Sequence, residues 1–562
     1  MNLTLRPSIV LCALAFAAHG HAQRYLTEVF TDAQITITPD VVYGTNIDFL
    51  TSTLSSPTVP AELVELHTAV ATGQPIPDAY FNPADGSTSV KVTNLMMDVY
   101  QPDQAIDEVE DRPVVLYLHT GNALPPPLNG SPNGRRTDST AVEICKRMAR
   151  RGYVAISMSY RLGWNPLAPT EQERRGQLLN AIYRAIHDTR HCIRGLKAGA
   201  GQGDNPYGIC GDRIIVLGEG TGGYIALANA TLDDPAELFI EKFRPDPFDP
   251  NVSYVDTLMV GNLAGFGGQL NLYQPNGWDH ESQFCVNLGG ALADESWLAD
   301  GDAPMVAFHA VFDPFAPFTE GIVIVPTTGG PVVPVHGSNH FMQLVNDFGN
   351  NAAFANMPDG DPFTDRARDL YGSTQTHGAV DVTINTGVEG LFPVVRPQWD
   401  PPFGEESSPW QFWDPLHPLA TAVVSPGPPP VTAHMASSMS NPDMSPTKAR
   451  AYIDSIMGYL NPRIHAALQL DAACSFVGID EPAHIAAGVD LWPNPASDVV
   501  TITSHNAPIA RYELLDINGR LLRASTAGRD RVELHRNGLA PGVYFVKLHF
   551  ADGTVTRKLV MD

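Results

Sequence analysis

Basic residues are scarce in this chain of 562 residues. Lysine and arginine together number 35 against 61 aspartates and glutamates, which gives a formal net charge of −26. A protein that binds nucleic acid needs a basic face for the phosphates, so this balance excludes nucleic acid as a partner. Hydrophobic residues make up 43% of the chain. That fraction supports large cores, and the length predicts more than one domain.

Long apolar runs are also lacking. Past the N-terminus no stretch reaches the roughly 18 apolar residues that a membrane span needs, so we predict no transmembrane segment. The short apolar run Ile9–Ala18 follows Arg6 and precedes the small-residue site Gly20-His21-Ala22. This order is typical of a signal peptide, which we place at residues 1–22, with a buried N-terminal helix as the alternative. We therefore predict an exported protein.

Cysteine is sparse, and no Cys-x-x-Cys pair occurs, which argues against a cysteine zinc site. We predict no metal site. Cys12 lies in the signal peptide, and an odd number remains, so at least one thiol stays free. Cys145 falls in a helical pattern and is expected to be a buried small hydrophobe. Export permits disulfides, and the pairings considered are Cys192 with Cys210, which flank one loop, and Cys285 with Cys474.

A serine is missing from the most informative motif. Residues 213–217 form a buried-strand pattern, a glycine-dense turn follows, and a helical pattern begins at Tyr224. A strand, a sharp turn and a helix form the nucleophile elbow, Gly-x-Ser-x-Gly, of hydrolases. Here the turn reads Gly218-Glu219-Gly220-Thr221-Gly222, so Gly220 stands at the nucleophile position. The complete motif, with its serine, occurs nowhere in the chain.

The same turn also matches the dinucleotide-binding pattern Gly-x-Gly-x-x-Gly, from Gly218 to Gly223. That site requires an acidic residue at the end of the next strand. Asp233 and Asp234 follow the helix directly, with no strand between. We therefore predict no nucleotide cofactor, and no other cofactor is indicated.

Strand and helix patterns alternate through most of the chain. Apolar strands are expected at 114–118, 153–160 and 303–309, with helices over 138–151, 171–197 and 445–460. Such alternation predicts an α/β fold with a doubly wound, mostly parallel sheet. We assign this domain to residues 23–475, with a loop-rich insertion around 345–431. The aromatic residues at 399–413 are expected to pack in its core.

The C-terminal part differs in pattern. Residues 476–489 have the character of a linker. Residues 490–562 contain several short alternating strands, with an Asn518-Gly519 hairpin turn. These strands predict a small β-sandwich.

Residues of about 90–465 resemble secreted carboxylesterases of the α/β-hydrolase fold. The resemblance rests on Asp98-Val-Tyr-x-Pro102, the turn His119-Thr-Gly-Asn122, Tyr160-Arg-Leu162, the Gly218 turn and His309 to Pro314. It implies ester hydrolysis through an acyl-enzyme. It would make Asp313 the triad acid and His434 the base, with His377 and His417 as rivals for the base. The N–H of Thr221 and one from Gly121 or Asn122 would be the oxyanion donors.

The nucleophile does not carry over, because Gly220 has no side chain. Removing a triad serine costs on the order of a million-fold in turnover. We therefore predict a non-catalytic or strongly weakened hydrolase, acting as a secreted or surface binding protein for a small ester or a surface ligand. The alternative is an active ester hydrolase in which His434 polarises a water in the space left by the serine oxygen.

Residues 490–562 resemble the type A C-terminal sorting domain of the type IX secretion system. The matching segments are Trp492-Pro-Asn-Pro495, Leu515-Asp-Ile-Asn-Gly-Arg520, Leu539-Ala-Pro-Gly-Val-Tyr544 and Lys558-Leu-Val560. The resemblance implies that the secretion machinery is a partner. It also implies export across the outer membrane, followed by release or attachment at the cell surface. An ordinary sandwich binding module is the alternative.

Overall fold

The computed structural model describes residues 24–201, 205–325, 327–357, 360–396, 406–474, 476, 488–515, 521–550 and 553–561. The predicted signal peptide and most of the predicted linker lie outside these residues. The chain divides into two compact units. One unit holds the described residues up to Ile193, Tyr207–Tyr273 and those of His280–Ser475; the other holds Arg194–Pro206, Gln274–Asp279 and the residues from Phe476 onward.

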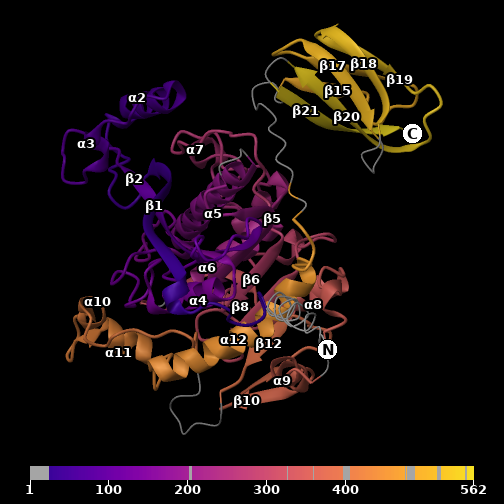
Figure 1. Cartoon of the computed structure of the whole chain (residues 1–562). Coiled ribbons are helices and arrows are strands. Elements are labelled where there is room, and N and C mark those ends of the chain that lie inside the picture. Colours follow the sequence, from indigo (N-terminus) through magenta and orange to yellow (C-terminus); the bar gives the residue numbers. More distant parts are fainter. Residues whose placement is uncertain are drawn as a thin grey trace, which may run out of the picture. The chain divides into compact units, whose positions relative to one another are not determined.

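The first unit is built on an eight-stranded sheet (Figure 1). Its order is β1-β2-β4-β3-β5-β6-β7-β12, with β1 and β2 antiparallel to their neighbours and the others parallel. The strands are β1 (Ile35–Ile47), β2 (Val92–Pro102), β3 (Arg112–Leu118), β4 (Val154–Met158), β5 (Ile209–Glu219), β6 (Phe284–Leu288), β7 (Met305–Ala310) and β12 (Leu391–Val394). This is the strand order of the α/β-hydrolase fold, and it confirms the predicted fold class.

Helices cover the sheet because its central strands are mostly apolar and must be buried on both faces. Every residue of β3, β4, β6 and β7 is buried. One face packs against α4 and α12 in a shared cluster. The helices are α2 (Val59–Thr72), α3 (Asp78–Phe81), α4 (Ser139–Arg150), α5 (Glu171–Gly201), α6 (Thr221–Thr231), α7 (Thr257–Val260), α8 (Ser338–Asp347), α9 (Pro362–Leu370), α10 (Pro418–Thr421), α11 (Ala433–Ser438) and α12 (Pro446–Ala467). None of the described helices is long and apolar enough to cross a bilayer.

Short elements complete this unit. The 3-10 turns are η1 (Asp32–Gln34), η2 (Pro235–Phe239), η3 (Glu241–Phe243), η4 (Glu295–Trp297) and η5 (Ala352–Phe354). Three hairpins lie outside the main sheet: β8 (Glu320–Ile324) with β9 (Pro331–His336), β10 (Thr374–His377) with β11 (Val380–Thr383), and β13 (Val423–Ser425) with β14 (Val431–Thr432).

The segment expected to be a loop-rich insertion contains part of the sheet itself. Strand β12 pairs in parallel with β7, so the region around 345–431 is not wholly an insertion. Strand β12 has only four residues, too few to stand out in the sequence pattern. Strand β6 is also short and was not predicted from the sequence. Trp410 and Phe412 pack in the core, as predicted, whereas Trp399 lies outside the described residues.

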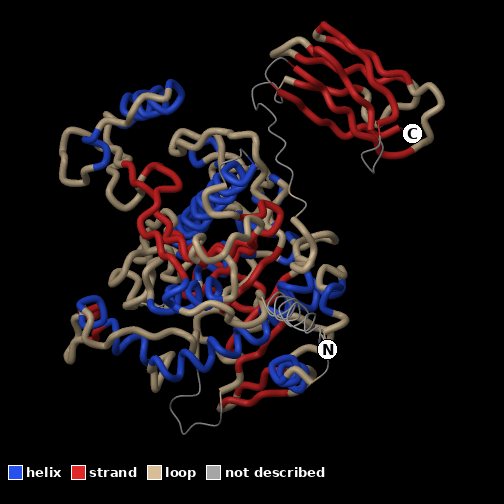
Figure 2. Tube along the Cα trace, viewed as in Figure 1, coloured by secondary structure: helices blue, strands red, loops and turns tan. Residues whose placement is uncertain are grey.

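The C-terminal residues form two antiparallel sheets over one hydrophobic core, as predicted for a sandwich. One sheet contains β15 (Val489–Trp492), β16 (Val499–Ser504) and β19 (Arg531–His535). The other contains β17 (Ile509–Leu515), β18 (Leu521–Arg529), β20 (Gly542–Phe550) and β21 (Gly553–Met561). Figure 2 shows strands and loops only over the described residues from 488 to 561. The predicted Asn518-Gly519 turn lies outside the described residues.

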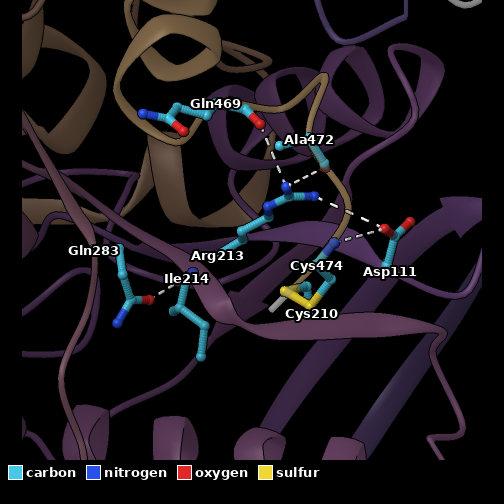
Figure 3. Close-up of a disulfide and its surroundings, with 8 residues drawn as sticks. All are labelled: Asp111, Cys210, Arg213, Ile214, Gln283, Gln469, Ala472 and Cys474. Atoms are coloured by element: carbon cyan, nitrogen blue, oxygen red, sulfur yellow. Dashed lines mark hydrogen bonds and ion pairs between the residues drawn. A yellow bond between two sulfur atoms is a disulfide. The ribbon is translucent and has the colours of Figure 1, made fainter. Parts of the chain in front are cut away.

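A disulfide joins Cys210 to Cys474 (Figure 3). Both pairings considered from the sequence are therefore wrong, because the partners lie 264 residues apart and only the fold brings them together. Around it, Arg213 donates to the carbonyls of Gln469 and Ala472, which holds the segment after α12 against β5. The free thiols among the described residues, Cys145, Cys192 and Cys285, are all buried, as predicted for Cys145.

Candidate functional site

The site lies where the strands of the main sheet end at their carboxyl edge. Thr120 follows β3, Gly220 follows β5 and Asp313 follows β7. In open α/β sheets, ligands bind at this edge. The three residues line one cavity of about 310 Å³. Gly121, Asn122 and Thr221, the expected oxyanion residues, line it too. The structure therefore brings together five of the six predicted site residues.

Gly220 keeps the backbone of an elbow. Its φ of 52° and ψ of −113° place it in a region that costs other residues strain. The turn is also tight, since a Cβ on Gly222 would lie 2.1 Å from the carbonyl oxygen of Leu118. The glycine-dense sequence is thus required by a sharp strand-to-helix turn against β3.

Thr120 occupies the space beside Gly220. A Cβ on Gly220 would lie 2.4 Å from the Thr120 Oγ1 and 3.2 Å from its Cβ. Both distances are shorter than a carbon atom tolerates without movement. A serine at this position would therefore need the Thr120 side chain to turn away.

One expected oxyanion donor is already engaged. The backbone N–H of Asn122 donates to the Thr221 hydroxyl over 2.6 Å. Asn122 itself has a positive φ of 60°. Thr221 itself is the first residue of α6, where backbone N–H groups have no partner within the helix. An arriving ligand oxygen would have to displace the Thr221 hydroxyl to reach Asn122.

The predicted acid sits in a structured turn. Asp313 Oδ1 accepts hydrogen bonds from the backbone N–H groups of Phe315 at 2.8 Å and Ala316 at 3.0 Å. It therefore begins a turn and also faces the cavity. Burial, and then the charge of Asp313, raise the pKa of Tyr224, a second residue of the cavity wall.

The predicted base is not among the residues that line the cavity. His434 lies on α11, where its Nδ1 accepts from the Trp413 indole at 3.2 Å and lies 3.3 Å from the Ser438 hydroxyl. His417 caps the start of α10, and His377 ends β10. Among the described residues that line the cavity there is no histidine.

Gln411, which the sequence reading did not single out, comes from the segment after β12 and faces the cavity. Its amide nitrogen donates to Glu219 at 2.9 Å, and its amide oxygen accepts from Asn133 at 3.2 Å. No motif marks this glutamine, because it becomes a site residue only through the fold.

Glu219 lies beneath the cavity and is 1% exposed. It accepts from the Tyr117 hydroxyl at 2.7 Å and the Trp410 indole at 3.0 Å, in addition to Gln411. Burial raises the pKa of the Glu219 carboxyl above its usual range, although these hydrogen bonds oppose the shift. Because three side chains donate to it, Glu219 holds Gln411 and the neighbouring residues in place.

Many residues of the cavity wall carry hydroxyl or amide groups, and Asp313 is its carboxylate. The polar wall residues include Thr120, Asn129, Ser131, Ser407, Ser408, Gln411, Ser437, Ser440 and Asn441. A smaller apolar cavity of about 80 Å³ shares Asn122, Thr221, Tyr224 and Val323 with it. The shared residues place a polar and an apolar chamber side by side.

Comparison with known proteins identifies the tail. Residues 490–562 match the family model described as a secretion system C-terminal sorting domain. This match confirms the predicted sorting domain. It indicates export across the outer membrane, with the secretion machinery as partner and release or attachment at the surface. No curated protein matches the chain.

Solved structures share the fold only weakly. Esterase 2 of Thermogutta terrifontis phosphoramylated by tabun is 16% identical, with a TM-score of 0.26 over 40% of this chain and 70% of its own. MGS-M1, an α/β hydrolase from a Medee basin deep-sea metagenome library, is 16% identical, with a TM-score of 0.23 over 40% and 66%. PorZ of the Porphyromonas gingivalis type IX secretion system is 25% identical, with a TM-score of 0.13 over 14% and 12%. These similarities are too weak to assign a function, and the fold is assigned from the strand order alone.

Proposed function

We propose that this exported protein binds a small neutral ligand in the cavity at the end of β5 and does not hydrolyse esters. The observation that carries the proposal is the pair Gly220 and Thr120. The nucleophile position has no side chain, and the Thr120 hydroxyl stands 2.4 Å from where one would begin. An acyl-enzyme cannot form without a nucleophile at this position.

The absence of a base from the cavity wall supports the same proposal. General-base catalysis needs a group within about 3 Å of the proton that it removes, or one water away. The Nδ1 of His434 is held by Trp413, and Gln411 lines the cavity instead. A glutamine amide does not accept a proton at neutral pH. We therefore infer that Gln411 stands at the base position and orients a ligand through hydrogen bonds.

The wall chemistry defines the class of ligand. The described wall residues include no lysine, arginine or histidine, so the cavity does not favour an anion. Hydroxyls and amides both donate and accept, which suits a hydroxyl-rich molecule. Tyr224 and Phe315 add aromatic surface, and the adjoining apolar cavity offers room for a small apolar group. A sugar that carries a short acyl group meets these requirements.

Hydrolysis is tested with the mature, tag-free chain and short-chain p-nitrophenyl esters. We expect turnover equal to that of His434→Ala and Asp313→Asn. We also expect no mass increase after treatment with a fluorophosphonate, because no activated serine is present. Turnover that falls in His434→Ala would instead support the water-based esterase.

Binding is tested by calorimetry with a panel of neutral sugars and their acetyl and butyryl esters. Ala436 lines the cavity, so Ala436→Trp should fill it and weaken binding by at least about tenfold. The neighbouring Met435 is exposed and does not line the cavity, which makes Met435→Trp the matched control. Equal binding by both variants would place the ligand elsewhere.

A further inference from the structure

A second group of chemically reactive side chains lies outside the cavity. Glu295, His336 and His340 each offer one ligand atom, and these atoms lie within 4.8 Å of one another. The residues come from three elements: Glu295 begins η4, His336 ends β9 and His340 lies in the first turn of α8. Separate elements therefore converge on one point.

His340 is oriented from both sides. Its Nε2 lies 2.7 Å from Glu295, and its Nδ1 lies 3.1 Å from Glu320. Glu320 begins β8 and is the register partner of His336 across the hairpin. A carboxylate behind a ligating imidazole is the usual way in which proteins fix its tautomer and direction. Glu320 has that place relative to His340.

His336 has a buried nitrogen without a hydrogen-bond partner, its Nδ1. Such atoms are uncommon in folded proteins. The His336 ring lies 4.7 Å from the His340 ring, centroid to centroid.

The lysine nearest the cluster is paired with a carboxylate. Lys242 is paired with Asp294 at 2.8 Å and donates to the carbonyl of Pro334 at 3.1 Å. Its charge is therefore balanced by a carboxylate of its own. Glu295 and Glu320 add two further negative charges to the cluster.

We propose that Glu295, His336 and His340 bind one divalent first-row transition-metal ion, with zinc as the expected ion. Two imidazoles and one carboxylate are a ligand set that zinc accepts, at about 2.0–2.2 Å from each atom. The observed spacing requires small side-chain movements, chiefly separation of Glu295 from His340. This metal site goes beyond the proposed ligand-binding function and does not depend on it.

The ion would fix one wall of the cavity. His336 and Glu320 close the open end of the β8–β9 hairpin, and Val323 of the same hairpin lines both cavities. Trp297, two residues after Glu295, lines the apolar cavity. Joining η4, β9 and α8 through one ion would therefore hold the hairpin in place over the ligand.

Zinc binding is measured on the tag-free mature chain after chelator dialysis, by competition with a chromophoric chelator. We expect one ion per chain, unaffected by excess Mg²⁺. His336→Gln and His340→Gln should each weaken binding by at least about tenfold to a hundredfold, and Glu320→Gln by about tenfold. The control is His67→Gln, which changes a partly exposed histidine on α2 and should bind zinc as the unaltered chain does.

Two results would overturn the site: no stoichiometric zinc in the unaltered chain, or unaltered affinity in the double variant His336→Gln/His340→Gln. If circular dichroism shows that the variants do not fold, the site is tested instead by the visible absorption spectrum of Co²⁺ bound to the unaltered chain. We expect intense visible bands from a low-coordinate nitrogen and oxygen site. A spectrum equal to that of aqueous Co²⁺ would also contradict the proposal.

Discussion

The hydroxyl of Thr120 lies where a side chain on Gly220 would begin. A Cβ on Gly220 would lie 2.4 Å from the Thr120 Oγ1. The two residues come from the ends of β3 and β5, which are neighbours in the sheet. A change at either position therefore alters what the other can hold, and this coupling is measurable.

Gly220→Ala should lower the free energy of unfolding by about 2–4 kcal/mol. About 1–3 kcal/mol reflects backbone strain, and the rest reflects overpacking against Thr120. Gly73→Ala is the matched control, since Gly73 has a φ of 67° and open space around its Cβ position. In a double-mutant cycle by urea denaturation, Thr120→Gly should recover the overpacking part. Strict additivity would contradict the shared space.

Rebuilding the site should require three changes. Gly220→Ser supplies the nucleophile, Thr120→Gly makes room, and Gln411→His supplies a base in the cavity that Asp313 also lines. We expect the triple variant to release p-nitrophenol about 10²-fold or more faster than Gly220→Ser/Thr120→Gly, the usual contribution of a general base. Equal rates would show that Gln411 does not occupy the base position.

Much of the fold could be read from residue patterns, and part of the site could not. The apolar strand at 114–118 and the glycine-dense turn carry their structure locally. The oxyanion turn and Asp313 could be located because they follow recognisable strands. Gln411 could not, because its role depends on where a long segment after the four-residue β12 returns to the sheet. His434 has the expected chain order, but its ring accepts a hydrogen bond from Trp413 and it is not among the residues that line the cavity.

The Cys210–Cys474 disulfide should contribute about 2–5 kcal/mol to the stability of the α/β unit. It closes a loop of 264 residues, and long loops lose the most chain entropy when cross-linked. Cys210→Ser/Cys474→Ser should therefore lower the melting temperature, as should dithiothreitol on the unaltered chain. The control is Cys192→Ser, which removes a buried free thiol but keeps the disulfide. The same reductant should still lower the melting temperature of this variant. A melting temperature that is insensitive to reduction would exclude a stabilising bond.

Acid should destabilise the fold through His119. Burial lowers the pKa of His119 from 6.5 to about 4, and its ring stacks on Tyr160. Between these values the unfolded chain binds a proton that the folded chain excludes, so stability falls as the pH drops from 6.5 toward 4. His119→Phe keeps a stacking ring but does not titrate. Relative to His119→Phe, the unaltered chain should lose up to about 3 kcal/mol of its free energy of unfolding between pH 7 and pH 4. If the difference in free energy of unfolding between the two proteins stays constant, as measured by urea denaturation at each pH, His119 is not the cause of the acid sensitivity.

The C-terminal residues should act as an independent export module. Their core includes Leu548 and Val500, and every residue of that core lies between Val489 and Met561. A unit with its own core folds by itself, so Leu548→Ala should destabilise it by about 2–5 kcal/mol. Calorimetry should show only one of two transitions shifted, whereas Leu116→Ala in β3 should shift the other.

In cells, deletion of 490–562 should leave a folded, disulfide-bonded α/β unit in the periplasm, because the machinery has lost its recognition domain. Normal export of this truncated chain would refute the assignment of the sorting signal to the tail.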